Sequence, residues 1–462
     1  MSGAGVGSGY TGADTPHFLP GQMPLGEVSD RVLTVPVDFA RYRRAWWALF
    51  IFSCLLLGLF VASAVVVVWK GVGVFGNNDP VFWGFPILNY MWWLGIGHAG
   101  TFISAMLLLL NRPWRNSLNR MAELMTLMAV VCAGIYPILH LGRPWLFYWS
   151  APYPNTMELW PQFKSPTSWD FFAVLGYLFV SLMFIYIGAI PDFASARDHA
   201  RKRRYKIFYG LLALGWRGAS SHWAHWRRAY RFIALLAIPL VFAVSSGYSF
   251  LLDLSPETGW HSTVFPPYFV AGAIFSGFAL VIIIALGLRR FFGWQLLITV
   301  RHLDVLGVLL LASGWMTAYG YFADTFIAFY SGKEHEITMA MARLTGPMAW
   351  SWWTAIFFNL VCLQALWWPQ VRRNGKALLA IAVGVLIGMW CERWMLIIVP
   401  ATRDYLTATW QGYSPTFWDW SLFIGTFGLF LVPFSLFMRL LPMVSTFEVK
   451  EALHRYRGEA DD

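Results

Sequence analysis

The chain has 462 residues, of which 58% are hydrophobic and only 13% are charged, and its formal net charge is +10. Soluble domains carry about 25% charged residues, so this composition excludes an ordinary soluble globular protein and predicts a polytopic membrane protein. The four cysteines form no CxxC or CxxCH motif, which leaves iron–sulfur, zinc and c-type haem ligation by this chain unsupported. We expect Cys54, Cys132, Cys362 and Cys391 to be small buried apolar residues.

The N-terminal tail is polar and is interrupted by many Gly and Pro residues. It lacks the basic start and short apolar core of a secretory signal peptide. We expect the tail to be extended, and to be ordered only where a neighbouring subunit holds it.

Ten apolar stretches are long enough to cross a membrane as helices. A hydrocarbon core of about 30 Å requires roughly 20 apolar residues per helical crossing. Runs such as FAVLGYLFVSLMFIYIGAI are too long for strands and lack the alternation of a β-barrel, so an all-α bundle in lipid is predicted. The expected spans are residues 46–69, 84–110, 121–140, 170–190, 231–252, 266–288, 303–329, 347–368, 377–400 and 417–441.

Basic residues are concentrated on one predicted side of the membrane. With ten spans, both tails and the even-numbered connections share a side, and that side holds 27 of the 34 Lys and Arg residues. The positive-inside rule therefore predicts that both termini are cytoplasmic. The same rule accounts for the basic tract ARDHARKRRYK between the fourth and fifth spans, so nucleic-acid binding is not expected.

Two parts of the chain are similar to each other. FPILNYMWWLGIGHAGTFISA (85–105) and FPPYFVAGAIFSGFALVIIIA (265–285) align without gaps, so that Gly97 and Ala99 match Gly277 and Ala279. Each copy contains four spans, an even number, so both copies insert the same way up and the repeat is parallel.

The predicted organisation is a cytoplasmic tail (1–45), a flanking helix with its loop (46–83), a first four-helix bundle (84–252), a second four-helix bundle (253–400), and a flanking helix with a cytoplasmic C-terminal tail (401–462).

Three titratable residues of the first bundle are expected near the outer face of the membrane. His140 ends the third span, Asp170 begins the fourth, and Asp253 ends the fifth, which gives them similar depths. Ionisable groups in or beside the hydrocarbon are costly and by default indicate a functional site. The second copy has Tyr321 and Ser351 in place of His140 and Asp170, so only the first copy keeps this ionisable pair.

Each of these three residues also has a purely structural interpretation. Asp170 lies at a helix start, where a carboxylate favours the helix dipole and can cap the first turn. Asp253 is alternatively a solvated loop charge, and His140 an anchor for a helix end at the lipid headgroups. The sequence leaves both interpretations open for each residue.

The stretch HLGRPWLFYW follows the third span directly. Pro137 is expected to kink that span one turn before His140, and the GRP motif is expected to end the helix. Arg143, Trp145 and Trp149 form either an interfacial anchor or the wall of a pocket beside His140.

Other polar residues inside the spans also have two possible roles. His98 lies mid-span among small residues and is either a hydrogen-bonded packing residue or part of a ligand site. Glu123 and Asp304 occupy equivalent starts of the third and seventh spans. In the structural interpretation each carboxylate caps its helix or pairs with a nearby cation, Arg120 for Glu123 and Arg301 for Asp304. In the functional interpretation each belongs to a proton path.

The ninth span contains the adjacent pair Glu392 and Arg393. Because neighbouring helical residues point to different faces, their partners are expected elsewhere. Glu392 is a further candidate for a proton path. Haem is not expected, because axial ligation needs two histidines at matched depth, and His98 and His140 lie at different depths.

At HLGRPW, SWDFF, LLDLS and GIGHAG the sequence resembles the NrfD/polysulfide-reductase family of membrane subunits, and within it the ActC type of subunit of alternative complex III. The likeness covers nearly the whole chain beyond residue 35. It implies a subunit of a quinol oxidoreductase in the bacterial inner (cytoplasmic) membrane. That subunit would oxidise menaquinol or ubiquinol near the periplasmic face without haem, an iron–sulfur cluster or another metal of its own.

The resemblance also implies site residues and partners. Electrons would pass to a periplasmic iron–sulfur subunit, multihaem c-type cytochrome subunits and a terminal oxidase, with a paralogous membrane subunit alongside. The alternatives are a secondary transporter, which also uses repeated bundles, and a purely structural ActF-like subunit. The implied residues are catalytic His140, Asp170 and Asp253; quinol-binding Arg143, Trp169, Tyr136 and His98; and, for a proton path, Glu123, Asp304 and Glu392.

Overall fold

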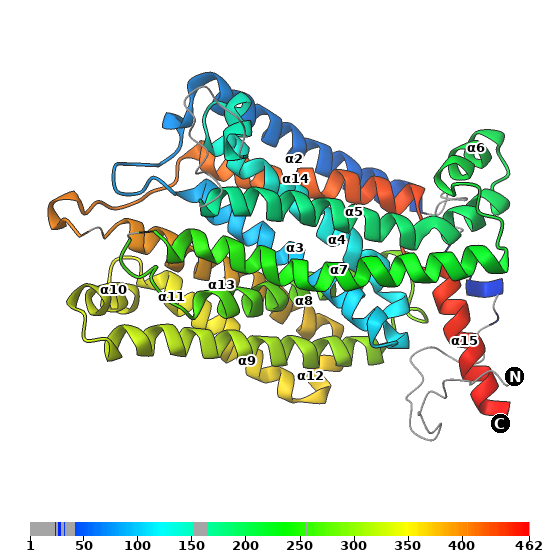
Figure 1. The fold of residues 1–462 in the computed structure, drawn as a ribbon. Coiled ribbons are helices and arrows are strands. Elements are labelled where there is room, and N and C mark those ends of the chain that lie inside the picture. Colours follow the sequence, from blue (N-terminus) through cyan, green and yellow to red (C-terminus); the bar gives the residue numbers. More distant parts are fainter. Residues whose placement is uncertain are drawn as a thin grey trace, which may run out of the picture.

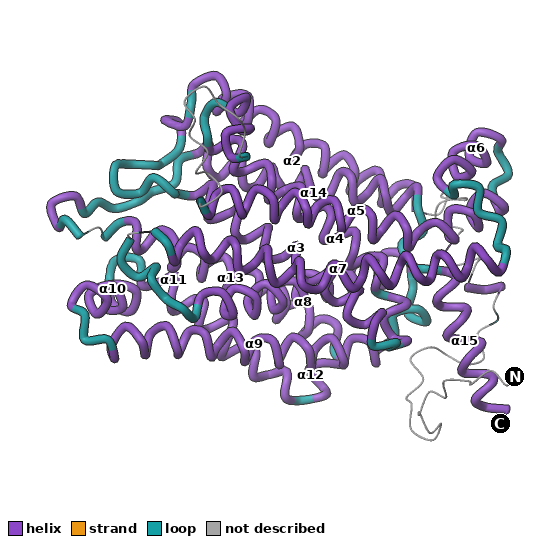
Figure 2. Tube along the Cα trace, in the orientation of Figure 1, coloured by secondary structure: helices purple, strands orange, loops and turns teal. Residues whose placement is uncertain are grey.

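The computed structural model describes residues 24, 26–28, 32, 42–151, 165–255, 257–403 and 405–461. These residues form helices and connecting loops, and no strand occurs among them (Figure 2). The expectation for most of the N-terminal tail falls outside the described residues, and loop residues 152–164 are also outside them.

Within the described residues, ten helices are long and apolar enough to span a membrane, as predicted. The chain is therefore an all-α, multi-pass membrane protein. The eighth span is irregular, because α11 (Ala349–Ile356) continues through a π-helical turn (Phe357–Val361) into a 3-10 helix (Cys362–Trp367). The other nine spans are α2 (Arg43–Lys70), α3 (Phe85–Leu109), α4 (Asn119–His140), α5 (Pro166–His199), α7 (Ser220–Asp253), α8 (Phe265–Phe292), α9 (Val300–Tyr330), α13 (Gly375–Ala401) and α14 (Phe417–Leu440).

The spans run between two ends of an elongated bundle (Figure 1). We call one end the basic end, formed by the described residues of 110–118, 200–219, 293–299, 368–374 and 441–461. The far end is formed by those of 71–84, 141–151, 254–264, 331–348 and 402–416. Short helices at the basic end are η3 (Pro113–Ser117), α6 (Arg203–Leu212), α12 (Pro369–Arg373) and α15 (Thr446–Asp461). Those at the far end are η2 (Val72–Val74), η4 (Pro144–Ser150), α10 (Glu334–Thr345) and η8 (Thr407–Thr409).

The helix α3 is the centre of the protein. Within its most apolar window, 83% of the residues are buried, compared with 22% for the peripheral α2. α3 packs against four other spans, α4, α7, α8 and α13. Gly277 of α8 faces Ala99 of α3, and a Cβ at Gly277 would lie only 1.9 Å from the Cβ of Ala99. A small residue at this crossing is therefore required for the two helices to approach.

The helices around α3 form two groups. In the first group α3 packs on α4, α4 on α5, α5 on α7 and α7 on α3, while in the second α8 packs on α9 and α13, and α13 on α11. α2 and α14 pair along one side. Gly425 and Gly428 of α14 lie against the backbone of α2, where added Cβ atoms would come within 2.5 Å and 2.1 Å of it. One continuous set of buried apolar side chains extends through both groups.

The C-terminal helix α15 is attached to the basic end through buried polar groups. Glu448 accepts hydrogen bonds from Arg115 of η3 and from Asn119 of α4. The Oδ1 atom of Asp192 in α5 accepts a hydrogen bond from the Thr446 backbone N at 3.1 Å. These contacts fix the start of α15 against the first group of helices.

The expectation that all four cysteines are buried is wrong for two of them. Cys132 and Cys391 are buried, but Cys54 is exposed and Cys362 is only partly buried. The physical reason is that a lipid-facing helix is apolar on all sides, so apolar surroundings in the sequence do not identify its buried face.

Candidate functional site

Asp170 is buried near the far end of the first group of helices, in the second turn of α5. Its Oδ2 atom accepts a hydrogen bond of 2.6 Å from the Tyr90 hydroxyl of α3, and its Oδ1 atom is buried without a hydrogen-bond partner. The N-cap of α5 is Ser165, and no side chain caps this end. The capping alternative for Asp170 is therefore wrong, because its carboxylate points across to α3.

Tyr248 of α7 completes this cluster. Its ring lies 5.1 Å from the Tyr90 ring in a T-shaped arrangement, and its hydroxyl is buried without a hydrogen-bond partner. A buried tyrosine hydroxyl ordinarily has a partner. Neither tyrosine was predicted from the sequence; the only signal is a polar hydroxyl placed inside an apolar span. The unpaired hydroxyl of Tyr248 and the unpaired oxygen of Asp170 thus flank Tyr90.

His140 is the last residue of α4, as predicted from the HLGRPW motif. Pro137 lies inside the last turn of α4, and Gly142, with a φ of 69°, follows the helix end in the left-handed conformation that glycine tolerates. The imidazole is mostly buried, and its Nδ1 atom has no hydrogen-bond partner. No hydrogen bond joins His140 to Asp170, although both residues lie at the far end.

Two further site candidates lie apart from Asp170. Asp253 ends α7 and is half-buried; its Oδ1 atom accepts a hydrogen bond of 3.3 Å from the Ser262 backbone N. This bond ties Asp253 to the loop that leads into α8. Tyr136 lies one turn before His140, but its hydroxyl is 3.4 Å from the Thr426 Oγ1 atom, so it faces α14.

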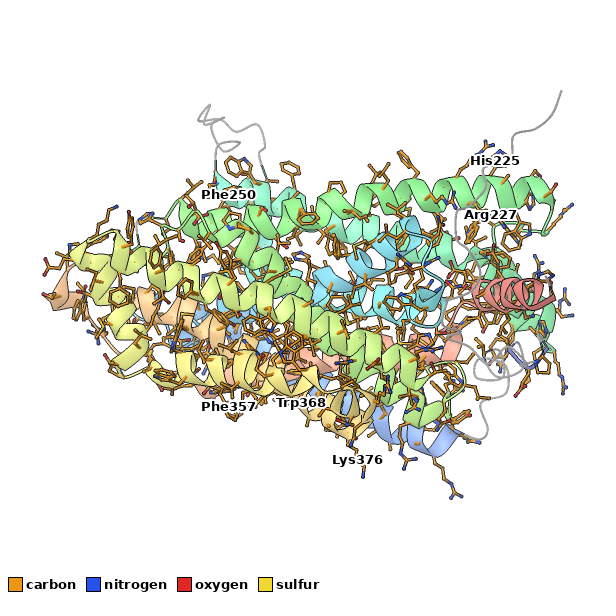
Figure 3. The ribbon with its side chains drawn as sticks, turned by 90° about the horizontal axis from the view of Figure 1, so that it is seen from below. His225, Arg227, Phe250, Phe357, Trp368 and Lys376 are labelled. Atoms are coloured by element: carbon orange, nitrogen blue, oxygen red, sulfur yellow. The ribbon has the colours of Figure 1, made fainter. Side chains whose placement is uncertain are left out.

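The three tryptophans at the far end that the sequence singled out, Trp145, Trp149 and Trp169, are exposed. Trp169 is 41% exposed, and its ring lies 6.4 Å from that of Phe250, which joins the start of α5 to the last turns of α7. Phe250 is labelled in Figure 3. Arg143 is exposed, and Trp145 and Trp149 are 60% and 56% exposed. Their exposure at the end of a span favours the interfacial-anchor interpretation for these three residues.

His98 lies deeper, in the middle of α3. Its Nδ1 atom is 2.7 Å from the Ser245 Oγ atom of α7, and its ring lies 5.1 Å from that of Tyr177 in α5. These contacts fit a hydrogen-bonded packing residue. The Nε2 atom is nevertheless buried without a partner, which leaves a second hydrogen-bonding position available inside the bundle.

Glu123 is buried toward the basic end. It accepts hydrogen bonds from the Ser104 hydroxyl at 2.5 Å and from the Tyr230 hydroxyl at 3.0 Å, and its Oε2 atom has no partner. The alternative of an ion pair between Glu123 and Arg120 is wrong, because Arg120 reaches across to α5 and pairs with Asp192 at 2.9 Å.

One series of polar side chains runs along α3 from the far end toward the basic end. Together its members contact side chains of α4, α5 and α7, so hydrogen-bonding groups occur at intervals along the inside of the apolar bundle. In order, the contacts are Tyr90 with Asp170, His98 with Ser245, Thr101 with Thr126 and Ser181, and Ser104 with Glu123.

A second buried carboxylate lies in the second group of helices. Glu392 of α13 accepts hydrogen bonds from Tyr268 at 2.5 Å and from Tyr321 at 3.4 Å. Arg393 lies over the Phe269 ring of α8 at 4.4 Å, so both neighbours have partners on other helices, as expected. Arg393 also donates to Glu392 at 3.3 Å, a contact that was not expected. The long Arg393 side chain folds back toward its neighbour in an interior that offers few acceptors. Asn359, in the π-helical turn, donates to the Tyr321 hydroxyl at 2.8 Å.

Asp304 lies at the basic end of α9 and is partly exposed. Its Oδ1 atom pairs with Arg372 Nε at 2.9 Å, and its Oδ2 atom lies 3.7 Å from Arg373. The structure therefore provides Asp304 with cations from α12, a helix that sequence spacing alone does not connect to it. Among the described residues, no group of three or more His, Cys, Asp or Glu side chains is placed to hold a metal ion.

Residues 73–402 match the family described as polysulphide reductase, NrfD. The chain belongs to the NrfD family. The matched region of this NrfD chain contains every candidate site residue described above, while the flanking pair α2 and α14 lies outside it. The family predicted from the sequence motifs is thereby confirmed.

Three relatives of this NrfD chain are, by name, subunits of reductases or oxidoreductases. The C subunit of selenate reductase from Mesobacillus selenatarsenatis is 23% identical over 86% of this chain and 94% of its own length. The putative membrane C subunit of a dimethyl sulfoxide reductase from Halobacterium salinarum is 22% identical over 80% of each chain. The Hdr-like menaquinol oxidoreductase integral membrane subunit from Archaeoglobus fulgidus is 21% identical over 83% of this chain and 90% of its own length.

Proposed function

We propose that this NrfD chain is the quinol-oxidising membrane subunit of a respiratory complex of the alternative complex III type. One observation carries the proposal. His140 Nδ1 and Asp170 Oδ1 are buried at the far end, on consecutive spans, and neither atom has a hydrogen-bond partner. Burying an unpaired polar atom costs free energy, so two such atoms at one end of a bundle indicate a place for a polar ligand.

A quinol supplies the groups that these atoms lack. It has two hydroxyls on an apolar ring, and its oxidation to the quinone releases two protons and two electrons. A neutral imidazole and a carboxylate can each accept a hydroxyl hydrogen bond and then its proton. The free Tyr248 hydroxyl can donate to an oxygen of the quinone product, and Tyr90 holds the Asp170 carboxylate in place by its 2.6 Å hydrogen bond.

The same proposal assigns an orientation and a set of partners. The basic end faces the cytoplasm of a bacterial inner membrane, because it carries most of the Lys and Arg residues. The far end then faces the periplasm. A docked iron–sulfur subunit takes the two electrons there, and multihaem c-type cytochromes and a terminal oxidase follow. The menaquinol oxidoreductase subunit among the relatives supports a quinol as the substrate.

The series of polar side chains along α3 supports a proton path in the same subunit. These side chains extend from the buried Glu123, near the basic end, to the depth at which His98 lies. One carboxylate oxygen of Glu123 has no hydrogen-bond partner. We therefore propose Glu123 as the group that takes up protons from the cytoplasmic side. Buried ionisable residues that face a bundle interior are the usual members of such paths.

Quinone binding to the full chain in lipid nanodiscs tests the proposal. A short-chain quinone, titrated calorimetrically, is expected to bind the wild-type chain saturably and to bind Asp170→Asn and His140→Ala at least about tenfold more weakly, because each loses a hydrogen-bonding group of the site. The matched control is Ser351→Ala, which alters the position equivalent to Asp170 in the second copy. Equal binding by all four proteins would refute this location of the site.

A further inference from the structure

The short helix α6 connects α5 to α7 at the basic end and has a large exposed apolar surface. Ile207, Phe208, Leu211 and Leu214 are 55%, 42%, 73% and 69% exposed. These residues lie together on the outward side of the helix or directly after it. Isolated exposed apolar residues are normal in proteins, but four within eight residues form a patch that requires a covering partner.

The inner side of α6 is held firmly against the spans. The Tyr209 hydroxyl donates to the Leu440 carbonyl of α14 at 2.6 Å, and the Tyr186 hydroxyl of α5 donates to the Leu212 carbonyl at 3.0 Å. The orientation of α6 is therefore fixed by two helices, and its apolar side is presented outward. Figure 1 shows α6 standing off the side of the bundle, away from α15.

These hydrogen bonds also give the depth of α6 relative to the membrane. Tyr186 belongs to the apolar part of α5, and Leu440 is the last residue of the α14 span. One residue before Leu440, Arg439 lies over the Trp46 ring at 4.8 Å, an arrangement typical of the membrane–water interface. α6 thus lies at the boundary between the hydrocarbon and the headgroups.

A cluster of exposed cations accompanies the apolar side. Five exposed cations lie just before α6 or in it. Near them, the ion pairs are formed by Arg197 and Arg227, and within the described part of the chain none of the five forms an ion pair. An amphipathic helix with cations beside an exposed apolar face is typical of binding to an anionic membrane surface. The five cations are Arg201, Lys202, Arg203, Arg204 and Lys206.

We propose that α6 is a binding site for anionic phospholipids in the leaflet at the basic end. The apolar side chains enter the acyl-chain region, and the cations bind the lipid phosphates. Two observations favour anionic lipids as the partner: the positive charge of the five cations and the position of α6 at the membrane surface. An acidic soluble protein or a nucleic acid would satisfy the cations but would leave Leu211 and its apolar neighbours against water. The proposal is independent of the quinol site, so either can fail without the other.

The depth of α6 can be measured with a spin label at Leu211→Cys in the full chain, after Cys54 and Cys362 are replaced by Ser. Relative accessibility to oxygen and to a water-soluble nickel complex reports the surroundings of the label. Leu55→Cys, on the lipid side of α2, provides the lipid reference, and Thr407→Cys, exposed at the far end, provides the water reference. The label at Leu211 is expected to be more accessible to oxygen and less accessible to the nickel complex than the Thr407 label, in nanodiscs that contain phosphatidylglycerol.

The contribution of charge is tested by a pair of matched double variants. Arg203→Gln with Lys206→Gln is expected to lower the preference for phosphatidylglycerol over phosphatidylcholine roughly 30-fold, measured by native mass spectrometry. Arg228→Gln with Lys376→Gln removes the same charge from exposed positions outside α6 and should leave the preference unchanged (Lys376 is labelled in Figure 3). A Leu211 label as accessible to water as the Thr407 label, or equal loss in both double variants, would overturn the proposal.

Discussion

The Tyr90 hydroxyl of α3 donates a 2.6 Å hydrogen bond to the Asp170 carboxylate of α5, across 80 residues of sequence. The bond occupies one carboxylate oxygen and leaves the other buried and free. A carboxylate that is held by one donor and still has an open acceptor is suited to receive a ligand hydroxyl. The relationship also explains why Asp170 is buried and does not cap its own helix.

Asp170→Asn is expected to lower quinol oxidation roughly 10²-fold or more, because it keeps the volume but removes the base. Tyr90→Phe leaves the base but loses its positioning hydrogen bond, so a loss of about tenfold is expected. Turnover is measured per assembled complex with quinol as donor. Normal turnover in Asp170→Asn would remove this residue from the mechanism.

His140 and His98 are expected to respond differently to substitution. His140→Ala removes the unpaired imidazole at the far end, so quinol turnover should fall sharply, roughly 10²-fold, while assembly is retained. His98→Ala breaks the 2.7 Å contact with Ser245 and should mainly reduce the yield of folded protein. If His98→Ala loses catalysis and His140→Ala does not, the quinol site lies deeper than proposed.

Glu123→Gln is expected to reduce proton uptake from the basic end while quinol oxidation continues. The amide can still accept the Ser104 hydrogen bond but cannot carry a proton between two sites. Protons translocated per electron are counted in proteoliposomes. Tyr230→Phe is the control, because it removes a donor to Glu123 without removing the titratable group. An unchanged ratio in Glu123→Gln would exclude Glu123 from proton uptake.

The orientation can be tested in intact cells by labelling engineered thiols with a membrane-impermeant reagent. The charge distribution predicts that Ser165→Cys, at the far end, is labelled from outside and that Ala219→Cys, at the basic end, is not. Both substitutions are made in a chain in which Cys54 is replaced, since Cys54 is exposed. The reverse labelling pattern would place the quinol site on the cytoplasmic side.

Glu448→Gln is expected to destabilise the protein by roughly 3–5 kcal/mol, because the buried Arg115 cation loses its ion-pair partner. Burial disfavours the charged guanidinium, but the attraction of Glu448 outweighs that effect and raises the pKa of Arg115 above its ordinary value. Thermal unfolding in detergent measures the change. Glu451→Gln removes the more exposed contact with Arg227, at 3.7 Å, and should change stability by about 1 kcal/mol or less. Equal effects of the two variants would contradict the buried role of Glu448.

Much of the fold follows from the sequence because bilayer thickness sets the length of a span. All ten apolar runs became helices, and Pro137 with the GRP motif located the end of α4 at His140. Placing His140, Asp170 and Asp253 at one end required only counting spans. These properties depend on distance along the chain, which hydrophobic length and helix-ending residues encode directly.

The partners of each polar side chain were decided only by the tertiary structure. Arg120 pairs with Asp192 and not with Glu123, and Glu392 is held by tyrosines from two other helices. In a span that is apolar on all sides, no hydrophobic face indicates which way a side chain points. The rotation of each helix is set by close packing between helices, such as that of Gly277 against Ala99. Sequence therefore determined the depth of the site residues, and packing determined which of them meet.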